Sequence, residues 1–307
     1  MDTPLRRRGF TIVELLVTLV IIGVLGLALS RMFVGQLRAY GRSQAANAAQ
    51  RDLRLGLSLL PMDLRTASVP LNDLTQMTDS SIALRATIGN SVVCERPATN
   101  VIDLPPLGLA HNVLTSWYAT PLPGDWITVY VSSDADPSKD SWRLLQVVSI
   151  AAAPSTVCAG QPFTDPVLDP PATKPRWRVT LSDTVSTVEA GPGKPVRFLR
   201  SVKYSLYHTS SASANWYLGY RDSVNGAWSS VEPIAGPFAP YAATGSGVKF
   251  TYYDTTGAVV AAPVPGTRIG RVDVAMRTYN RVRGGKDSVV VRDSVKLRIA
   301  LRNRQTL

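Results

Sequence analysis

The sequence has little of the chemistry on which most enzymes and metal sites depend. Its 307 residues include only two cysteines and two histidines, too few to build a zinc ribbon. Acidic residues are also in the minority, with 22 Asp and Glu against 33 Lys and Arg and a formal net charge of +11. The apolar fraction of 45% is too high for a disordered chain. The basic balance allows acidic partners such as nucleic acid or anionic lipid headgroups, but it does not indicate a fold.

What the sequence does have is a long apolar run near its start. Residues 10–30 carry one charged side chain, Glu14, and at about 1.5 Å per residue they would form about 31 Å of helix. That length matches the hydrocarbon core of a bilayer. The run follows three arginines, Arg6 to Arg8, which favour a cytoplasmic N-terminus. We therefore expect a single membrane span with the chain beyond Ser30 exported.

Three interpretations of the apolar run are open. It could be a cleaved secretory signal, of the ordinary or the twin-arginine kind, with the small residues Ala28 and Ser30 at the cleavage site. An exported soluble binding module or enzyme would then be released after cleavage near Ser30. It could be a plain signal anchor. The third interpretation starts from the carboxylate of Glu14.

A charge inside a spanning helix needs a reason, because at the bilayer centre it costs on the order of 2.5 to 3.5 kcal/mol on insertion scales. Cleavage between Gly9 and Phe10 would create a new α-amino group four residues before Glu14 and at the same membrane depth. A neighbouring copy of the mature chain could then supply the missing cation. An ordinary signal sequence has no use for such a carboxylate.

The stretch Arg-Gly-Phe-Thr-Ile-Val-Glu-Leu-Leu-Val at residues 8–17 resembles the type III signal of type IV prepilins and type II secretion pseudopilins. The resemblance implies that prepilin peptidase cuts after Gly9 and N-methylates Phe10, and that Glu14 pairs with the N-terminus of an adjacent subunit. It also implies a single-pass inner-membrane protein with a periplasmic C-terminal domain. Its partners would be membrane lipid before assembly and then other minor and major pilins or pseudopilins.

After the leader of residues 1–9 and the membrane segment, helix is expected to continue over residues 31–66. Ala, Leu, Arg and Gln dominate there, and Leu53, Leu57, Leu60 and Leu64 fall on one face that should pack on the following domain. Glycines along the helix, and Pro61 near its end, favour a bent rod. Helix from Phe10 to Thr66 would be about 85 Å long.

Residues 67–307 are expected to form an exported β-rich globular domain. Its strands follow from β-branched and aromatic runs, with alternating faces in the last two. The predicted strands are Ser81–Thr87, Trp126–Val131, Arg143–Ile150, Trp177–Leu181, Val196–Tyr207, Trp216–Arg221, Val248–Tyr253, Ile269–Tyr279 and Val289–Leu301. Turns are expected at 254–257 and at Asn225-Gly226. The fold class is therefore α+β and pilin-like, a long N-terminal helix packed on an antiparallel sheet.

Residues 88–175 are interpreted as a Pro-rich elaboration on that sheet. The segment Val-Lys-Phe-Thr-Tyr-Tyr-Asp at 248–254, followed by Gly257 and a strand, resembles minor pilins of the PilW type and the larger minor pseudopilins. The exported domain is larger than that of a major pilin. We therefore expect a minor, non-catalytic subunit that initiates or caps a type IV pilus or a type II secretion pseudopilus.

The two cysteines, Cys94 and Cys158, both fall in the exported part, where a disulfide between them would pin the Pro-rich elaboration to the sheet. The alternative is two unpaired thiols. Asp134, Asp136 and Asp140 are weak candidates for calcium, because a lysine interrupts them and no bidentate glutamate follows. A solvated turn is the better interpretation, and no cofactor or metal is expected.

Neither His111 nor His208 is part of a nucleophile motif, so no catalytic residue is expected. The aromatic residues Trp216, Tyr217, Tyr220, Trp228 and Tyr241, with Arg221, could stack on sugars or bases, but sheet packing explains them equally well. A tip adhesin that binds DNA or a glycan is therefore an alternative. Nucleic acid is an unlikely partner on this pattern, because Lys and Arg are scattered along the sequence.

Overall fold

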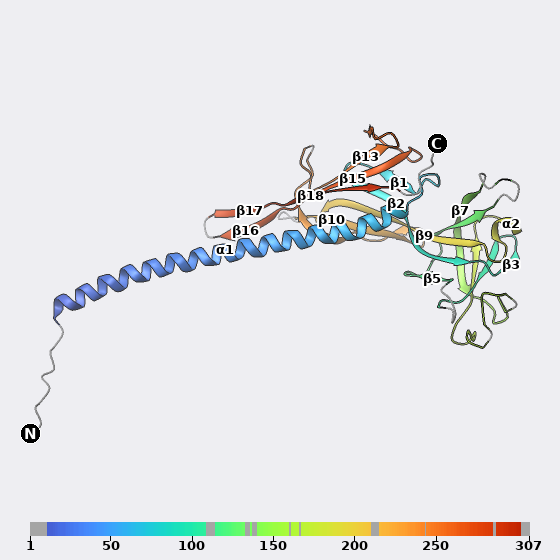
Figure 1. Cartoon of the computed structure of the whole chain (residues 1–307), viewed down its shortest axis with the longest axis horizontal. Helices are drawn as coiled ribbons and strands as arrows, with labels where there is room; N and C mark the ends of the chain where they lie inside the picture. Colours follow the sequence, from blue (N-terminus) through green and yellow to red (C-terminus); the bar gives the residue numbers. More distant parts are fainter. Residues whose placement is uncertain are drawn as a thin grey trace, which may run out of the picture.

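The structure, a computed structural model, describes residues 11–108, 114–132, 136, 140–159, 161–165, 167–209, 215–242, 244–284 and 287–301, with the side chains of 281–289 outside that description. One helix projects far from the globular part of the chain (Figure 1). The globular part packs only along the second half of that helix.

The described residues form one long helix, one short helix and a set of antiparallel strands. The helices are α1 (Ile12–Thr66) and α2 (Thr187–Ala190). The strands are β1 (Leu74–Met77), β2 (Ser81–Val92), β3 (Glu95–Ala98), β4 (Val101–Leu104), β5 (Ser116–Trp117), β6 (Trp126–Val131), β7 (Ser141–Ala152), β8 (Trp177–Leu181), β9 (Pro195–His208), β10 (Trp216–Val224), β11 (Ala227–Trp228), β12 (Glu232–Phe238), β13 (Val248–Asp254), β14 (Val259–Val260), β15 (Ile269–Arg277), β16 (Asn280–Gly284), β17 (Asp287–Val291) and β18 (Ser294–Ala300). This arrangement confirms the predicted α+β class.

Helix α1 is continuous over 55 residues, which corresponds to about 82 Å at 1.5 Å per residue. It curves gently (Figure 1), and it runs through Pro61 to its last residue Thr66. Residues 11–40 are exposed throughout, and burial begins in the forties with Ala49 as the first fully buried residue. The predicted apolar face is confirmed in large part: Leu53, Leu60 and Leu64 are buried, while Leu57 is half-buried.

The second half of α1 fills the opening between two sheets. Strands β2 and β12 of the large sheet contact it on one side, and β18 of a four-stranded sheet contacts it on the other. On the opposite side the sheets approach each other directly, where the Phe250 amide donates to the Asp79 carbonyl at 2.8 Å. The buried core between them includes Leu60, Leu218 and Phe250. Helix and both sheets therefore share one hydrophobic core.

Strands β2 and β9 are long enough to leave that core and enter a second one. They pair antiparallel from Ser81↔Ser205 to Val92↔Pro195, with a bulge between Thr87 and Gly89. Beyond the bulge, β9 also pairs with β6. The sheet then continues from β6 through β7, β8 and β4 to β3, each strand paired with the next. A separate apolar cluster that includes Ile127 and Phe198 fills this part. Strands β3, β4, β6, β7 and β8, together with the adjoining ends of β2 and β9, form a lobe beyond the C-terminal end of α1 (Figure 1). We call this part the distal lobe.

Two sequence predictions need correction at the C-terminal end. The predicted strand Val289–Leu301 is two strands, β17 and β18, with a break at Asp293. There the Asp293 carbonyl accepts hydrogen bonds from the amide and the hydroxyl of Thr278, and the Asp293 amide donates to the same hydroxyl. The predicted strand Ile269–Tyr279 ends at Arg277, and β16 begins three residues later. Strands β16 and β17 form a hairpin that runs beside α1 (Figure 1), where the Asn280 amide donates to the Ala45 carbonyl at 3.3 Å. The turns at 254–257 and at Asn225-Gly226 are confirmed.

The region predicted as an elaboration, residues 88–175, holds more regular structure than its prolines suggest. It contributes β6 and β7 to the large sheet, and β6 pairs directly with the central strand β9. Its boundaries as a unit remain a prediction. The segment from residue 154 to 175, which holds six of the prolines, lies in turns and coil where it is described.

Candidate assembly site at the N-terminal helix

The first described turn of the chain is a capping box. Thr11 is the N-cap of α1, and its hydroxyl oxygen accepts the Glu14 amide at 3.2 Å. In return, the Glu14 carboxylate accepts the Thr11 amide at 3.1 Å and lies 3.3 Å from the Thr11 hydroxyl. This reciprocal arrangement satisfies two amide groups that a helix start leaves without partners. Within one subunit, Glu14 therefore has a local role as well as the predicted intermolecular one.

The helix that follows Glu14 presents bare apolar surface. It is the one helix of the described residues that is long and apolar enough to cross a membrane, with a mean hydropathy of 2.8 and none of that window buried in the chain. Ile12, Leu19 and Leu29 are each more than 60% exposed. Thr18 is a polar residue in this run, but its hydroxyl donates to the Glu14 carbonyl at 2.9 Å. Such a surface requires lipid or other apolar helices around it.

The predicted processing residues Gly9 and Phe10 lie outside the described residues, so cleavage and N-methylation there remain predictions. Thr11 is the first residue that the structure describes, and α1 begins directly after it. The predicted partner of Glu14, a neighbouring N-terminus, likewise remains a prediction.

The two cysteines are joined. Cys94 and Cys158 form a disulfide with a Cα–Cα distance of 5.4 Å, and both are fully buried. The Cys158 amide also donates to the Glu95 carboxylate at 2.7 Å. A small apolar cluster with Val157 surrounds the bridge. The disulfide thus ties the segment 154–175, close to its start, to the junction of β2 and β3.

The three aspartates considered for calcium do not form a described cluster. Asp134 lies outside the described residues, and Asp140 accepts a hydrogen bond from the hydroxyl of Tyr130. That bond raises the pKa of the Tyr130 hydroxyl. Asp136 is half-buried. No group of three or more His, Cys, Asp or Glu side chains in the described part of the chain is placed to hold a metal ion.

The aromatic residues grouped in the sequence are separated by the sheet. Trp216 and Tyr220 point inward from β10 and pack against the main core, while Tyr217 points outward and meets Tyr207 with ring centroids 6.2 Å apart. Trp228 lies on the outside with the Arg221 guanidinium 5.0 Å from its ring. The remaining member, Tyr241, donates to the Asp79 carboxylate at 2.8 Å. These residues form several small contacts and no single stacking platform.

The histidines do not build a catalytic group. His111 lies outside the described residues, and the ring of His208 packs at a tilt against that of Trp216, with centroids 4.6 Å apart. The Nδ1 atom of His208 lies 2.9 Å from the Thr209 carbonyl. Both contacts are those of a surface residue at a strand end.

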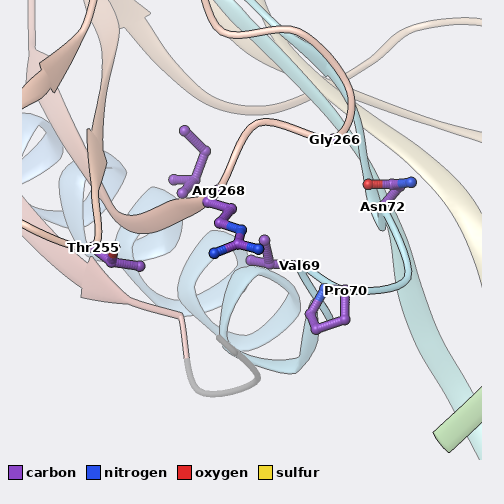
Figure 2. A pocket seen from close by; sticks show the side chains of 7 residues that line it. Val69, Pro70, Asn72, Thr255, Gly266 and Arg268 are labelled. Atoms are coloured by element: carbon purple, nitrogen blue, oxygen red, sulfur yellow. The ribbon is translucent and has the colours of Figure 1, made fainter. Parts of the chain in front are cut away.

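A small cavity of about 160 Å³ lies where the chain leaves α1 (Figure 2). Val69, Pro70 and Asn72 line it from the segment after the helix, and Thr255, Gly266, Arg268 and Ile269 line it from the loops around β14. Arg268 is the one charged side chain of this lining, and Figure 2 shows it between Thr255 and Val69. The lining lacks a second ionisable group that could share in acid–base chemistry.

Sequence reasoning missed a set of buried ion pairs. Arg200 donates to both oxygens of Asp125 at 3.0 and 2.8 Å, which raises the pKa of the arginine. In the distal lobe, Arg178 and Asp103 form a second bidentate pair at 2.8 and 2.7 Å. The partners are 75 residues apart in both pairs, so no local sequence pattern predicts that they meet. Such geometry fixes the strands that carry the pairs.

Comparison with protein families gives one finding, and it concerns the N-terminus. Residues 4–30 match the family described as the prokaryotic N-terminal methylation motif. Gly9, Phe10 and Glu14 all lie within this match, so the chain carries the signal of a type IV pilin-like precursor. The motif implies processing by prepilin peptidase and assembly with other pilins, and together with the apolar helix it fits single-pass anchoring in the inner membrane. No curated protein and no solved structure matches the chain.

Proposed function

We propose that the chain is a minor, non-catalytic subunit that initiates or caps assembly of a type IV pilus or a type II secretion pseudopilus. The observation that carries the proposal is that the methylation motif overlaps the exposed apolar part of α1. The matched residues end at 30, and the exposed helix continues to about residue 40 before the domain begins to cover it. A subunit with this shape is held in lipid before assembly and by neighbouring helices afterwards.

The size of the exported part supports a minor role within that class. Two sheets lie beside the second half of α1, and the distal lobe extends well past its end (Figure 1). A bulky domain of this kind is costly to repeat along a densely packed filament but can be accommodated at an end. The PilW-like pattern at 248–254 is consistent with this role. The choice between pilus and pseudopilus depends on the partner subunits.

The main rival is a soluble module released near Ser30. Against it, Ser30 lies in the interior of α1, which is continuous from Ile12 to Thr66. The first experiment is the intact mass of the protein purified from its native membrane. We expect a chain that begins at N-methylated Phe10, whereas a soluble periplasmic chain that begins at Arg31 would establish the rival. Retention of residues 1–9 would also contradict the proposal.

A second experiment separates the two roles of Glu14. Glu14→Gln removes the charge that a neighbouring amine would require, and Thr11→Val removes the N-cap hydroxyl while leaving the carboxylate in place. We expect Glu14→Gln to insert in the membrane normally but to co-purify with the filament subunits at least tenfold less. Thr11→Val should assemble nearly as the wild type does. Equal loss in both variants would mean that helix capping, and not charge pairing between subunits, is what Glu14 provides.

A further inference from the structure

The outer face of the four-stranded sheet gathers basic side chains that are scattered in the sequence. On β13, β15 and β18, alternate residues such as Phe250, Val274 and Ile299 point into the core and are at most 2% exposed. The residues between them point outward. We call the outward cations of these strands the basic face: Lys249, Arg271, Arg277, Lys296 and Arg298. Cations that are scattered along the sequence are therefore brought together on one face of this sheet.

The strand register makes these cations close neighbours. Ala275 of the central strand β15 pairs with Lys249 on one side and with Lys296 on the other. Asp273, also on β15, pairs with Arg298, and Arg271 lies two residues before it on the same face. Adjacent strands are about 4.8 Å apart, and alternate residues of one strand are about 7 Å apart. The cations thus form a two-dimensional array across three strands.

A single carboxylate lies beneath this array. Asp273 has a side chain that is 2% exposed, with ion-pair distances of 2.9 Å to Arg271, 3.1 Å to Lys296 and 3.9 Å to Arg298. One negative charge cannot neutralise three positive ones, and the side chains of Lys296 and Arg298 remain 53% and 69% exposed. Asp273 therefore holds the cations in place and leaves an excess of positive charge at the surface.

At one end the basic face opens into a cavity of about 580 Å³. Arg277 belongs to both, and Arg292 and Tyr279 line the cavity with the Arg292 guanidinium 5.7 Å from the Tyr279 ring. Asp293 also lines it, but its carboxylate accepts the Ser294 amide at 2.8 Å. The cavity extends the positive surface beyond the sheet and adds a second guanidinium that lies near an aromatic ring. The first is Arg271, which lies 3.8 Å from the centre of the Tyr253 ring.

We propose that the basic face binds the phosphate backbone of double-stranded nucleic acid without regard to sequence. A second copy of this chain is a poor occupant, because its net charge of +11 is of the same sign. The membrane that α1 crosses is also a poor occupant, because β13, β15 and β18 belong to the globular part beside the second half of α1, away from the bare first half of the helix (Figure 1). Protein partners require an apolar interface core, whereas this face presents Lys, Arg, Thr, Ala and Tyr.

Phosphate binding fits the remaining features. Nucleic-acid interfaces are polar and strongly positive, and backbone contacts come mainly from Lys and Arg side chains. A duplex presents phosphates on two strands, so a flat array of cations can meet several of them at once. Arginines supported on Tyr253 and Tyr279 keep a planar donor group oriented at the surface.

The test uses the full chain in nanodiscs of neutral lipid and a fluorescent 20-base-pair duplex, with anisotropy measured over a series of salt concentrations. Lys296→Gln/Arg298→Gln removes two cations of the basic face. Lys203→Gln/Arg221→Gln is the matched control, because these residues are cross-strand neighbours on the outside of the other sheet. Both double variants lose the same net charge. Arg277→Gln is a single variant of an exposed side chain, included in case the first double variant fails to fold.

Each phosphate contact contributes about 0.9 to the slope of log affinity against log salt. We expect Lys296→Gln/Arg298→Gln to reduce the slope by about 1.8 and to weaken binding about 60-fold at 0.1 M salt, and Arg277→Gln to weaken it about eightfold. The control should stay within about twofold of the wild type. Equal losses in the face and control variants would overturn the proposal. So would failure of the wild type to bind the duplex while it binds anionic vesicles or an acidic protein.

Discussion

The hydroxyl of Tyr204 on β9 donates a hydrogen bond of 2.6 Å to the carboxylate of Asp63 near the end of α1. Both groups are buried, and the bond joins residues 141 positions apart. It fixes the last turn of the helix against the central strand, at the level where the main core meets the distal lobe.

Tyr204→Phe should destabilise the domain, because it leaves a buried carboxylate without its hydroxyl donor. Loss of such a bond costs about 1–3 kcal/mol when the remaining partner stays buried. Tyr207→Phe is the matched control, since Tyr207 lies on the same strand but faces outward against Tyr217. Its effect should stay within about 0.5 kcal/mol. Denaturant titration of the detergent-solubilised protein measures both, and equal effects would contradict the role assigned to Tyr204.

The same carboxylate should make stability depend on pH. Burial raises the pKa of Asp63 above its ordinary value of 3.8, and the Tyr204 hydrogen bond only partly offsets this. Because the folded chain holds the proton more tightly than the unfolded chain, ionisation of Asp63 lowers the free energy of unfolding as pH rises above about 4. Below the unfolded pKa this penalty is absent.

Asp63→Asn should therefore gain stability over the wild type with increasing pH, and the gain should level off once Asp63 is ionised in the folded state. The asparagine oxygen can still accept the Tyr204 hydroxyl. Asp73, whose pKa is also raised by burial, is present in both proteins and cancels in the difference. Unfolding free energies at pH 4 to 7.5 test this, and a difference that does not change with pH would contradict it.

Gly56 of α1 lies close to side chains of both sheets. A Cβ atom there would lie 2.8 Å from the sulfur of Met276 and 3.6 Å from a methyl carbon of Leu218. Gly56→Leu should overpack the core and cost about 1–3 kcal/mol. Gly35→Leu should leave domain stability unchanged, because nothing lies within 4 Å of a Cβ atom at that position. The midpoint of denaturant unfolding, followed by tryptophan fluorescence, distinguishes the two.

The disulfide should stabilise the distal lobe more than it stabilises the helix contact. Closing a loop over a sequence separation of 64 residues is worth about 4 kcal/mol in the chain-entropy model, and measured values are about 2–4 kcal/mol. Cys94→Ser/Cys158→Ser should therefore expose the segment 154–175 to protease at lower denaturant concentration. Wild-type protein treated with a reductant should behave in the same way. Unchanged cleavage kinetics in both samples would show that the apolar packing alone holds this segment.

Local patterns predicted much of the fold. The strands at Trp126–Val131 and Trp177–Leu181 were predicted to the residue, and the others of the predicted set were found with shifted ends or a break. Short strands such as β3, β4 and β12 were missed, because prolines and few alternating positions obscure them. For the assembly site, the motif with Glu14 was readable in full, whereas the hydrogen bonds between Glu14 and Thr11 were found only in the structure, although the spacing Thr-x-x-Glu is that of a capping box.

The amino-acid sequence by itself determined the long helix, its apolar first half and the alternating strands, because hydrophobic periodicity and the leader motif are properties of neighbouring residues. Only the tertiary structure decided that Asp63 meets Tyr204, that Asp125 meets Arg200 and that five cations share one sheet face. Those relationships depend on strand register and on which sheet faces which, and both are set by packing between residues far apart in the chain. The physical reason is that long-range pairing is selected by burial of whole faces and not by any short stretch of sequence.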